Sequence, residues 1–186
     1  MIIMEICGIF EIVPDSLYSV QFDGEPKHEF LKTFRLWSDR TYLESFFTKH
    51  YEDLLAFWEY MSVEEAVAVT IGEGALLEET ILKIARAGMH GGYDNLSAIF
   101  KPLTPVATSL EHFEKSKARG FRRKSWLRVY AIRLGVNHFI VTGGVIKLTR
   151  TMNEREHLLN ELNKMEDVCR FLKADQRDEF GLFELF

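Results

Sequence analysis

The sequence predicts an α+β protein, in which a C-terminal antiparallel β-meander with a packed helix follows a helix-rich α/β N-terminal extension. Short runs of β-branched and aromatic residues, typical of strands, lie near the beginning of the chain and again in its last third. Apolar residues recur at helical spacing between residues 26 and 88 and again after residue 153. With 186 residues, 47% of them hydrophobic, the chain can form one good core or two small ones.

The first elements are predicted to be two strands and two short helices. Segment 2–13 ends before a proline, and the run LYSVQF at 17–22 precedes an Asp-Gly turn signal. This pattern indicates a short antiparallel strand pair. Apolar and aromatic residues then recur three or four positions apart over 30–37 and 43–47, which indicates two short helices. We expect this region to form a helical layer over a strand pair.

A long helix is predicted from Ser62 to Gly88. Ser62 and Glu65 have the spacing of a capping box, in which each side chain bonds to the backbone N–H of the other residue. Apolar residues line one face of the helix until Gly88, where the pattern ends. The segment LSAIF at 96–100 is expected to form a short apolar turn or helix.

The segment KPLTP, which ends at Pro105, is the best candidate for a boundary between two regions, because two prolines bracket it. This boundary divides the chain into residues 1–104 and residues 105–186. After it, residues 108–119 are predicted to form an exposed charged helix.

Three strands and a final helix are predicted for the rest of the chain. The strands are expected at 126–134, 138–142 and 145–149, and they form a meander. A Gly-Gly pair before the last strand fits either a tight hairpin turn or a bulge. Asn153 and Glu156 can cap the final helix, whose apolar residues alternate at spacings of four and three and pack on the sheet.

Charge is distributed unevenly along the chain. Residues 115–153 contain ten Lys and Arg residues and no Asp or Glu, although the net charge of the whole chain is −5. Residues 1–104 hold 8 bases and 17 acids, giving −9, and residues 105–186 hold 15 bases and 11 acids, giving +4. A positive surface suits a polyanion such as nucleic acid, and the acidic region could repel that polyanion or cover the surface. The alternative is that the basic residues pair with acids elsewhere in a soluble protein.

Several basic residues lie in or beside the predicted strands. Period-two alternation places Arg128 and Tyr130 on one face of the first strand, Lys147 lies within the third strand, and Arg150 lies just beyond it. Together such groups can hold a phosphodiester, neutralise charge on the phosphorus oxygens and protonate a leaving oxygen. RNA cleavage of this kind needs no metal, because the 2′-hydroxyl is the nucleophile. The alternative is that Arg128 pairs with a helix carboxylate and Tyr130 packs in the core.

Further residues are candidates for the same surface. His138 could transfer a proton if its strand faces the basic residues, although a plain edge-strand histidine is the simpler interpretation. Arg122, Arg123, Lys124 and Arg133 are expected to bind nucleic acid. For Arg133, as for Arg128, the alternative is an ion pair with a helix carboxylate.

Other classes of function are disfavoured. Cys7 and Cys169 are the only cysteines, too few for a disulfide framework or a cysteine zinc site. Glu154 and His157 have the Glu-x-x-His spacing of di-iron bundles, but such sites need a second copy, so we expect neither a metal nor a cofactor. The first 13 residues contain acids and no basic leader, which argues against a signal peptide or a membrane span. We therefore expect a cytoplasmic protein without a membrane partner.

The run WLRVYAIRLGVNHFIVTGGVIKLTRTMNERE at 126–156 resembles the RelE/HigB toxins of bacterial toxin-antitoxin pairs. The shared order is a strand with an Arg, an apolar strand, a Lys-containing strand, a polar turn and a helix. The resemblance covers about 50 of the 186 residues, and the whole chain is similar to Bacteroidetes proteins that carry the RelE label. It departs from the family where HigB-like toxins show paired lysines, since Lys147 is followed by Leu148, and its N-terminal extension has no counterpart in the compact toxins.

The resemblance implies a toxin that cleaves mRNA on the ribosome and is repressed by an antitoxin, for which a helix-turn-helix protein is one candidate. Carried over by position, Arg128 matches the Arg of the first motif strand, and Lys147 and Arg150 match the basic residues near the end of the last strand. Tyr130 or His138 would move a proton. The alternative is a non-catalytic module that keeps the RelE-like scaffold and binds nucleic acid or a protein through the basic surface.

Overall fold

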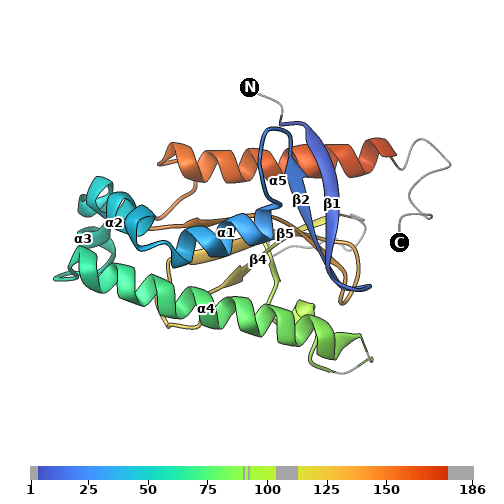
Figure 1. Ribbon diagram of the computed structural model, residues 1–186, viewed down its shortest axis with the longest axis horizontal. Coiled ribbons are helices and arrows are strands. Elements are labelled where there is room, and N and C mark those ends of the chain that lie inside the picture. The colour runs from blue at the N-terminus through green and yellow to red at the C-terminus, as the bar shows by residue number, and fades with distance from the viewer. Residues whose placement is uncertain (1–3, 90, 92, 104–112, 176–186) are drawn as a thin grey trace.

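The computed structural model describes residues 4–89, 91, 93–103 and 113–175. Its strands are β1 (Ile6–Val13), β2 (Leu17–Phe22), β3 (Lys101–Pro102), β4 (Glu114–Arg119), β5 (Leu127–Arg133) and β6 (Phe139–Ile146). They form one mixed sheet in the order β1-β2-β6-β5-β4-β3, in which only the β2–β6 pair is parallel. Helices cover both faces of the sheet (Figure 1). The predicted α+β class is confirmed.

The helices lie mostly where the sequence predicts them. They are α1 (Glu29–Ser38), α2 (Arg40–Lys49), α3 (Tyr51–Phe57), α4 (Val63–Gly88), the short 3-10 helix η1 (Leu96–Ala98) and α5 (Glu156–Asp175). Ser62 and Glu65 form the predicted capping box at the start of α4. The Asp39 side chain accepts a hydrogen bond from the Tyr42 N–H and so caps α2. Only α3 was not predicted, because it is too short for a helical period to be visible.

An antiparallel meander is present in the C-terminal region, but it consists of β4, β5 and β6. The helix predicted over 108–119 is wrong for Glu114–Arg119, which form β4, and residues 108–112 lie outside the described residues. Ser116 and Ala118 are buried, while the basic residues on either side of them are partly or fully exposed, as in a strand with one solvated face. The density of charge in this segment concealed that alternation.

The separate third strand predicted at 145–149 is also wrong, because Gly143 and Gly144 lie inside β6 and the strand continues through them. The register between β5 and β6 shifts at Tyr130 and Ala131, opposite this glycine pair. Of the two alternatives for the Gly-Gly pair, the structure therefore has the bulge and not the hairpin turn.

Both glycines permit close approach of helices to the sheet. A Cβ atom added to Gly143 would lie 2.0 Å from Oε2 of Glu161 in α5. A Cβ atom added to Gly144 would lie 2.3 Å from Cγ2 of Thr33 in α1. Because successive residues of a strand face opposite sides, α5 and α1 press on β6 from its two faces.

Two apolar clusters lie on the two faces of the sheet. The first packs α1, α2 and α4 against one face, with Trp37, Phe47 and Leu127 among its buried residues. The second packs α5 against the other face, where it covers Val20 and Tyr130. Each cluster contains residues from 1–104 and from 105–186. The expected boundary at residue 105, itself outside the described residues, therefore divides neither the sheet nor the core.

A buried group of charged residues joins α1 to α5. Lys164 Nζ lies 2.8 Å from Glu29 Oε2 and 2.7 Å from Glu161 Oε1. Burial raises the pKa of the Glu161 carboxyl to about 7. The two carboxylates raise the pKa of Lys164 against the opposing effect of its burial. The ammonium is therefore the charged centre of the group.

Within the described residues, no helix is both long enough and apolar enough to cross a membrane.

Candidate functional site

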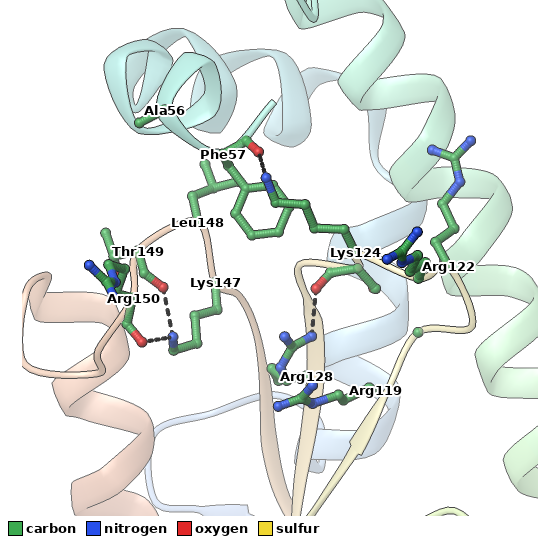
Figure 2. Close-up of a pocket in the computed structure, with 13 residues that line it drawn as sticks. Ala56, Phe57, Arg119, Arg122, Lys124, Arg128, Lys147, Leu148, Thr149 and Arg150 are labelled. Carbon is green, nitrogen blue, oxygen red and sulfur yellow. Dashed lines mark hydrogen bonds between the residues drawn. The ribbon is translucent and has the colours of Figure 1, made fainter. Parts of the chain in front are cut away.

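A pocket of about 370 Å³ lies at the end of the sheet where β4 ends, β5 begins and the chain after β6 turns towards α5 (Figure 2). Ala56 and Phe57 of α3 contribute to its wall. Seven basic residues line it: Arg119, Arg122, Arg123, Lys124, Arg128, Lys147 and Arg150. None of the described residues that line the pocket is acidic. We call it the basic pocket.

Main-chain carbonyls hold the two half-buried cations of the basic pocket in place. Lys147 Nζ donates hydrogen bonds to the carbonyl oxygens of Thr149 and Arg150, both at 2.7 Å. Arg128 Nη1 donates to the carbonyl oxygens of Ser125 at 2.8 Å and Leu127 at 2.6 Å. Neutral carbonyls orient these groups without cancelling their charge, so both cations remain available to an anion.

Few residues of the basic run pair with acids. Among the ten bases between residues 115 and 153, Lys115 pairs with Glu166, and Arg133 pairs with Glu114. No carboxylate within the described part of the chain forms an ion pair with any of the seven cations of the basic pocket. The alternative that acids elsewhere neutralise the basic run therefore applies at its edge but not in the pocket.

The loop between β4 and β5, which carries three of the cations, is held by α4. Oε1 of Glu73 accepts a hydrogen bond of 3.0 Å from the backbone N–H of Arg122, which leaves the Arg122 guanidinium exposed. A Cβ atom on Gly120 would lie 2.2 Å from that same oxygen and 2.3 Å from Ser125 Oγ, so a larger residue here would displace the side chains of Glu73 and Ser125. The Glu73 carboxylate thus fixes the backbone of the loop.

The opposite side of the loop is held by α3. Lys124 Nζ donates to the carbonyl oxygen of Phe57, and it lies 4.7 Å from the centre of the Phe57 ring and 5.0 Å from that of Trp58. Next along the chain, the buried Trp126 donates its indole N–H to Thr70 Oγ1 at 3.0 Å. These contacts fix the position of the pocket wall before any ligand binds.

Burial, and after it the positive charge of neighbouring bases, lowers the pKa of three basic side chains. Burial, together with Arg119, lowers the pKa of Arg128. Burial and then the charge of Arg128 lower the pKa of Lys147. Lys117, beside the pocket on β4, has its pKa lowered by burial and then by Arg119 and Arg128. A bound anion would relieve this repulsion, because it stabilises the charged form of every cation near it.

The structure brings together six of the residues expected from the sequence. Arg128, Lys147 and Arg150, which were expected to hold phosphates, line the basic pocket with Arg122, Arg123 and Lys124. Tyr130, His138 and Arg133 do not line it.

Tyr130 is buried beneath α5, with only 2% of its surface exposed. Its hydroxyl lies 3.1 Å from Sδ of Met152, and burial raises its pKa to about 12. A phenol in this position stays protonated and is covered from solvent. The structure thus shows the alternative in which Tyr130 packs in the core.

His138 and Arg133 lie at the other end of the strands. Arg128 pairs with Val145 at the pocket end, whereas Arg133 pairs with Phe139, the residue that follows His138. At about 3.3 Å per strand residue, this end is roughly 20 Å from the pocket. Arg133 Nη1 also contacts Glu114 Oε2 at 3.0 Å. The expected alternative of an ion pair therefore holds for Arg133, although its acid is on β4 and not on a helix.

Three contributors to the pocket were not identified as site residues from the sequence. Arg119 lies directly opposite Arg128 in the β4–β5 register, and only the correct assignment of β4 reveals this. Glu73 and Phe57 are far away in the chain, and no local pattern connects them to the loop at 120–125.

His157, the histidine of the Glu-x-x-His spacing, packs beside the pocket against the rings of Phe46 and His50. Its ring lies 5.1 Å from that of His50, and its Nε2 atom lies 3.2 Å from the carbonyl oxygen of Ile146. Burial lowers the pKa of both histidines. Among the described residues, no group of three or more His, Cys, Asp and Glu side chains is placed to hold a metal ion.

Comparison of the chain with protein-family models, curated proteins and solved structures gave no match. The assignment of function therefore rests on the residues and geometry of the basic pocket.

Proposed function

We propose that this chain binds RNA and that the basic pocket holds the phosphodiester backbone. One observation carries the proposal: seven cations from two separate segments, 119–128 and 147–150, converge on one pocket whose described lining residues include no acid. Such a surface binds polyanions through direct contacts and through the release of the counterions that surround them. The resemblance to the RelE/HigB toxins makes RNA the expected polyanion.

The chemistry of the pocket fits a phosphodiester. Guanidinium groups match phosphate oxygens with paired donors, and lysine adds a compact charge. The half-buried cations are oriented by main-chain carbonyls, so little side-chain freedom is lost when an anion binds. Burial and then the charge of neighbouring arginines lower the pKa of Arg128 and of Lys147, and a bound anion would stabilise the charged form of both.

A salt titration with matched charge variants tests this proposal. Arg119→Met and Arg150→Met each remove an exposed cation from the pocket, and Arg86→Met removes an exposed cation near the distal end of α4. Affinity for a single-stranded RNA oligomer is measured by fluorescence anisotropy at several salt concentrations. We expect each pocket variant to reduce the slope of log K against log salt by roughly 0.7, the value for one phosphate of a single strand. The Arg86→Met variant should keep the parent slope, and equal slopes for all four proteins would refute the proposal.

The second candidate is the mRNA-cleaving toxin implied by the resemblance, and the environment of Lys147 favours it. Burial and the charge of Arg128 lower the pKa of Lys147, so its ammonium gives up a proton more readily than an ordinary lysine. The 2′-hydroxyl would give up its proton to water as its oxygen attacks phosphorus, and a 2′,3′-cyclic phosphate would form as the bond to the 5′-oxygen breaks. Lys147 would donate the proton that turns this leaving oxygen into a hydroxyl. Arg128 would stabilise the charge on the phosphorus oxygens.

Binding and cleavage are separated by Lys147→Arg, which keeps the charge but holds its proton too strongly for transfer. In the toxin account, expression of the parent chain arrests growth and leaves mapped RNA ends with 2′,3′-cyclic phosphates, and Lys147→Arg does neither while still binding RNA. Co-expression of an antitoxin, for example a helix-turn-helix protein from an adjacent gene, should restore growth. Cleavage by the arginine variant at the parent rate would exclude Lys147 as the proton donor. If the parent chain binds RNA but never cuts it, the protein is the non-catalytic binding module and not the toxin.

A further inference from the structure

Aromatic side chains are exposed beside the basic pocket. Trp58, which is 37% exposed, directly follows Phe57 in the pocket wall. Phe121, which is 48% exposed, lies in the β4–β5 loop between two residues that line the pocket. Tyr60, between α3 and α4, is 92% exposed. Trp58 thus lies against a cation of the basic pocket, and Phe121 lies on the loop that carries three of its cations.

The two elements that carry these aromatic residues are held together. The Lys124 ammonium lies 5.0 Å from the centre of the Trp58 ring and also bonds to the carbonyl oxygen before that residue. Glu73 fixes the same loop through the backbone N–H of Arg122, the residue after Phe121. Trp58 and Phe121 are therefore exposed on segments whose positions are fixed by these contacts. The other two tryptophans, Trp37 and Trp126, are buried in the core.

Tyr60 is held in an unusual backbone conformation. Its φ of 65° lies in the left-handed region, which a bulky residue rarely adopts. Such a conformation is unfavourable and persists where the surrounding structure imposes it, often at ligand sites. The α3–α4 connection therefore presents Tyr60 to solvent at an energetic cost.

We propose that the ligand of the basic pocket is single-stranded and that one of its unpaired bases stacks on Trp58, with Phe121 supporting a neighbouring base. This inference rests on the proposed function and specifies its substrate. Cations alone would serve for a duplex, a free phosphate or a phosphorylated protein. Exposed aromatic rings beside them serve nucleic acid whose bases are free to leave the strand, because every base presents a stacking face. A duplex keeps its bases stacked inside and cannot use them.

The experiment measures binding of the full chain to four probes by anisotropy and by tryptophan fluorescence. The probes are a single-stranded oligouridylate, an RNA duplex of the same length, an abasic single strand of the same charge, and inorganic phosphate. Because Trp58 is exposed while Trp37 and Trp126 are buried, quenching by a stacked base reports on Trp58. The variants are Trp58→Leu and Phe121→Leu, with Tyr93→Leu as the matched loss of a fully exposed aromatic residue outside the pocket.

We expect oligouridylate to bind more tightly than the duplex or the abasic strand and to quench the emission of the parent. Trp58→Leu should weaken its binding roughly 5- to 150-fold, the range for loss of one stacked base, with the salt slope unchanged. Phe121→Leu should act in the same direction, and Tyr93→Leu should match the parent. Binding of the abasic strand should not respond to Trp58→Leu. Thermal unfolding checks that each variant is folded.

The outcomes separate this inference from the proposed function. If Arg119→Met weakens binding while Trp58→Leu and Phe121→Leu do not, phosphates bind in the pocket but no base stacks there. A duplex or an abasic strand that binds as tightly as oligouridylate overturns the inference in the same way, as does binding without quenching. If no probe binds, or only phosphate binds, the proposed function fails and the inference fails with it.

Discussion

Replacing Lys147 with methionine removes one positive charge from the basic pocket while keeping a side chain of similar length. In the parent, Lys147 Nζ donates two hydrogen bonds of 2.7 Å to the carbonyl oxygens of Thr149 and Arg150. Arg150 is exposed and Thr149 partly so, and water can therefore replace the ammonium at these carbonyls. The substitution also removes a charge that repels Arg128, since burial and then the charge of Arg128 lower the pKa of Lys147.

These effects oppose each other in the free protein but not in the complex. Each lost hydrogen bond costs about 0.5 to 1.5 kcal/mol before hydration and relief of repulsion are counted. We therefore expect the free energy of unfolding to change by about 1 kcal/mol or less. In the complex the variant loses a charge-assisted hydrogen bond to a phosphate, worth about 1.5 to 3 kcal/mol. Affinity for RNA should fall roughly 10- to 150-fold.

Urea denaturation and fluorescence anisotropy with single-stranded RNA at low salt measure the two quantities on the same preparations. Arg86→Met is the matched control, because it removes the same charge far from the pocket. Parent-like affinity in Lys147→Met would refute the reasoning, as would an equal loss in Arg86→Met, since the second result would show that only net charge matters. A large loss of stability would show that Lys147 is a structural residue.

Three other predictions concern the scaffold. Gly120→Ala should weaken RNA binding at low salt and lower the melting temperature, because its Cβ would displace Glu73 Oε1, which lies 2.2 Å from that position; a parent-like affinity would show that the loop tolerates the shift. Residues 105–186 alone should lack cooperative unfolding by circular dichroism, because both apolar clusters need residues from 1–104, and a cooperative transition would contradict the shared core. Burial raises the folded-state pKa of Glu161 to about 7 from an ordinary 4.5, so this group's contribution to stability is complete below about pH 4.5 and is lost as pH rises towards 7. Between pH 5 and pH 8 the parent should therefore lose more stability in urea denaturation than Glu161→Gln does, and equal losses would refute the assignment.

Local patterns predicted most of the helices and strands. Ser62 and Glu65 mark the start of α4 because a capping box is formed within one turn. The alternation in β5 is visible because its charges lie only at Arg128 and Arg133. The alternation in β4 was missed because Lys115 and the two bases after it are charged, and a solvated face with that density of charge resembles a helix surface.

The candidate site was predicted only in part, because local patterns identify its charged residues but not the contacts made by tertiary packing. The run without acids around Arg128 and Lys147 is a property of the sequence, and after folding no described carboxylate forms an ion pair with either residue. Tyr130 was expected at the site because alternation gives its face but not what covers that face, which is α5. The contribution of Glu73 depends on the packing of α4 beside the β4–β5 loop, and no local pattern encodes that contact.

The most direct test of the central claim, that the basic pocket holds RNA, is to map where RNA touches the full chain. Single-stranded RNA containing thiouridine is photo-cross-linked to the protein at low salt, and mass spectrometry identifies the cross-linked peptides. We expect cross-links within 119–128, within 147–150 and at Trp58. Cross-links confined to β1 or to the outer face of α5, with none at the pocket, would contradict it.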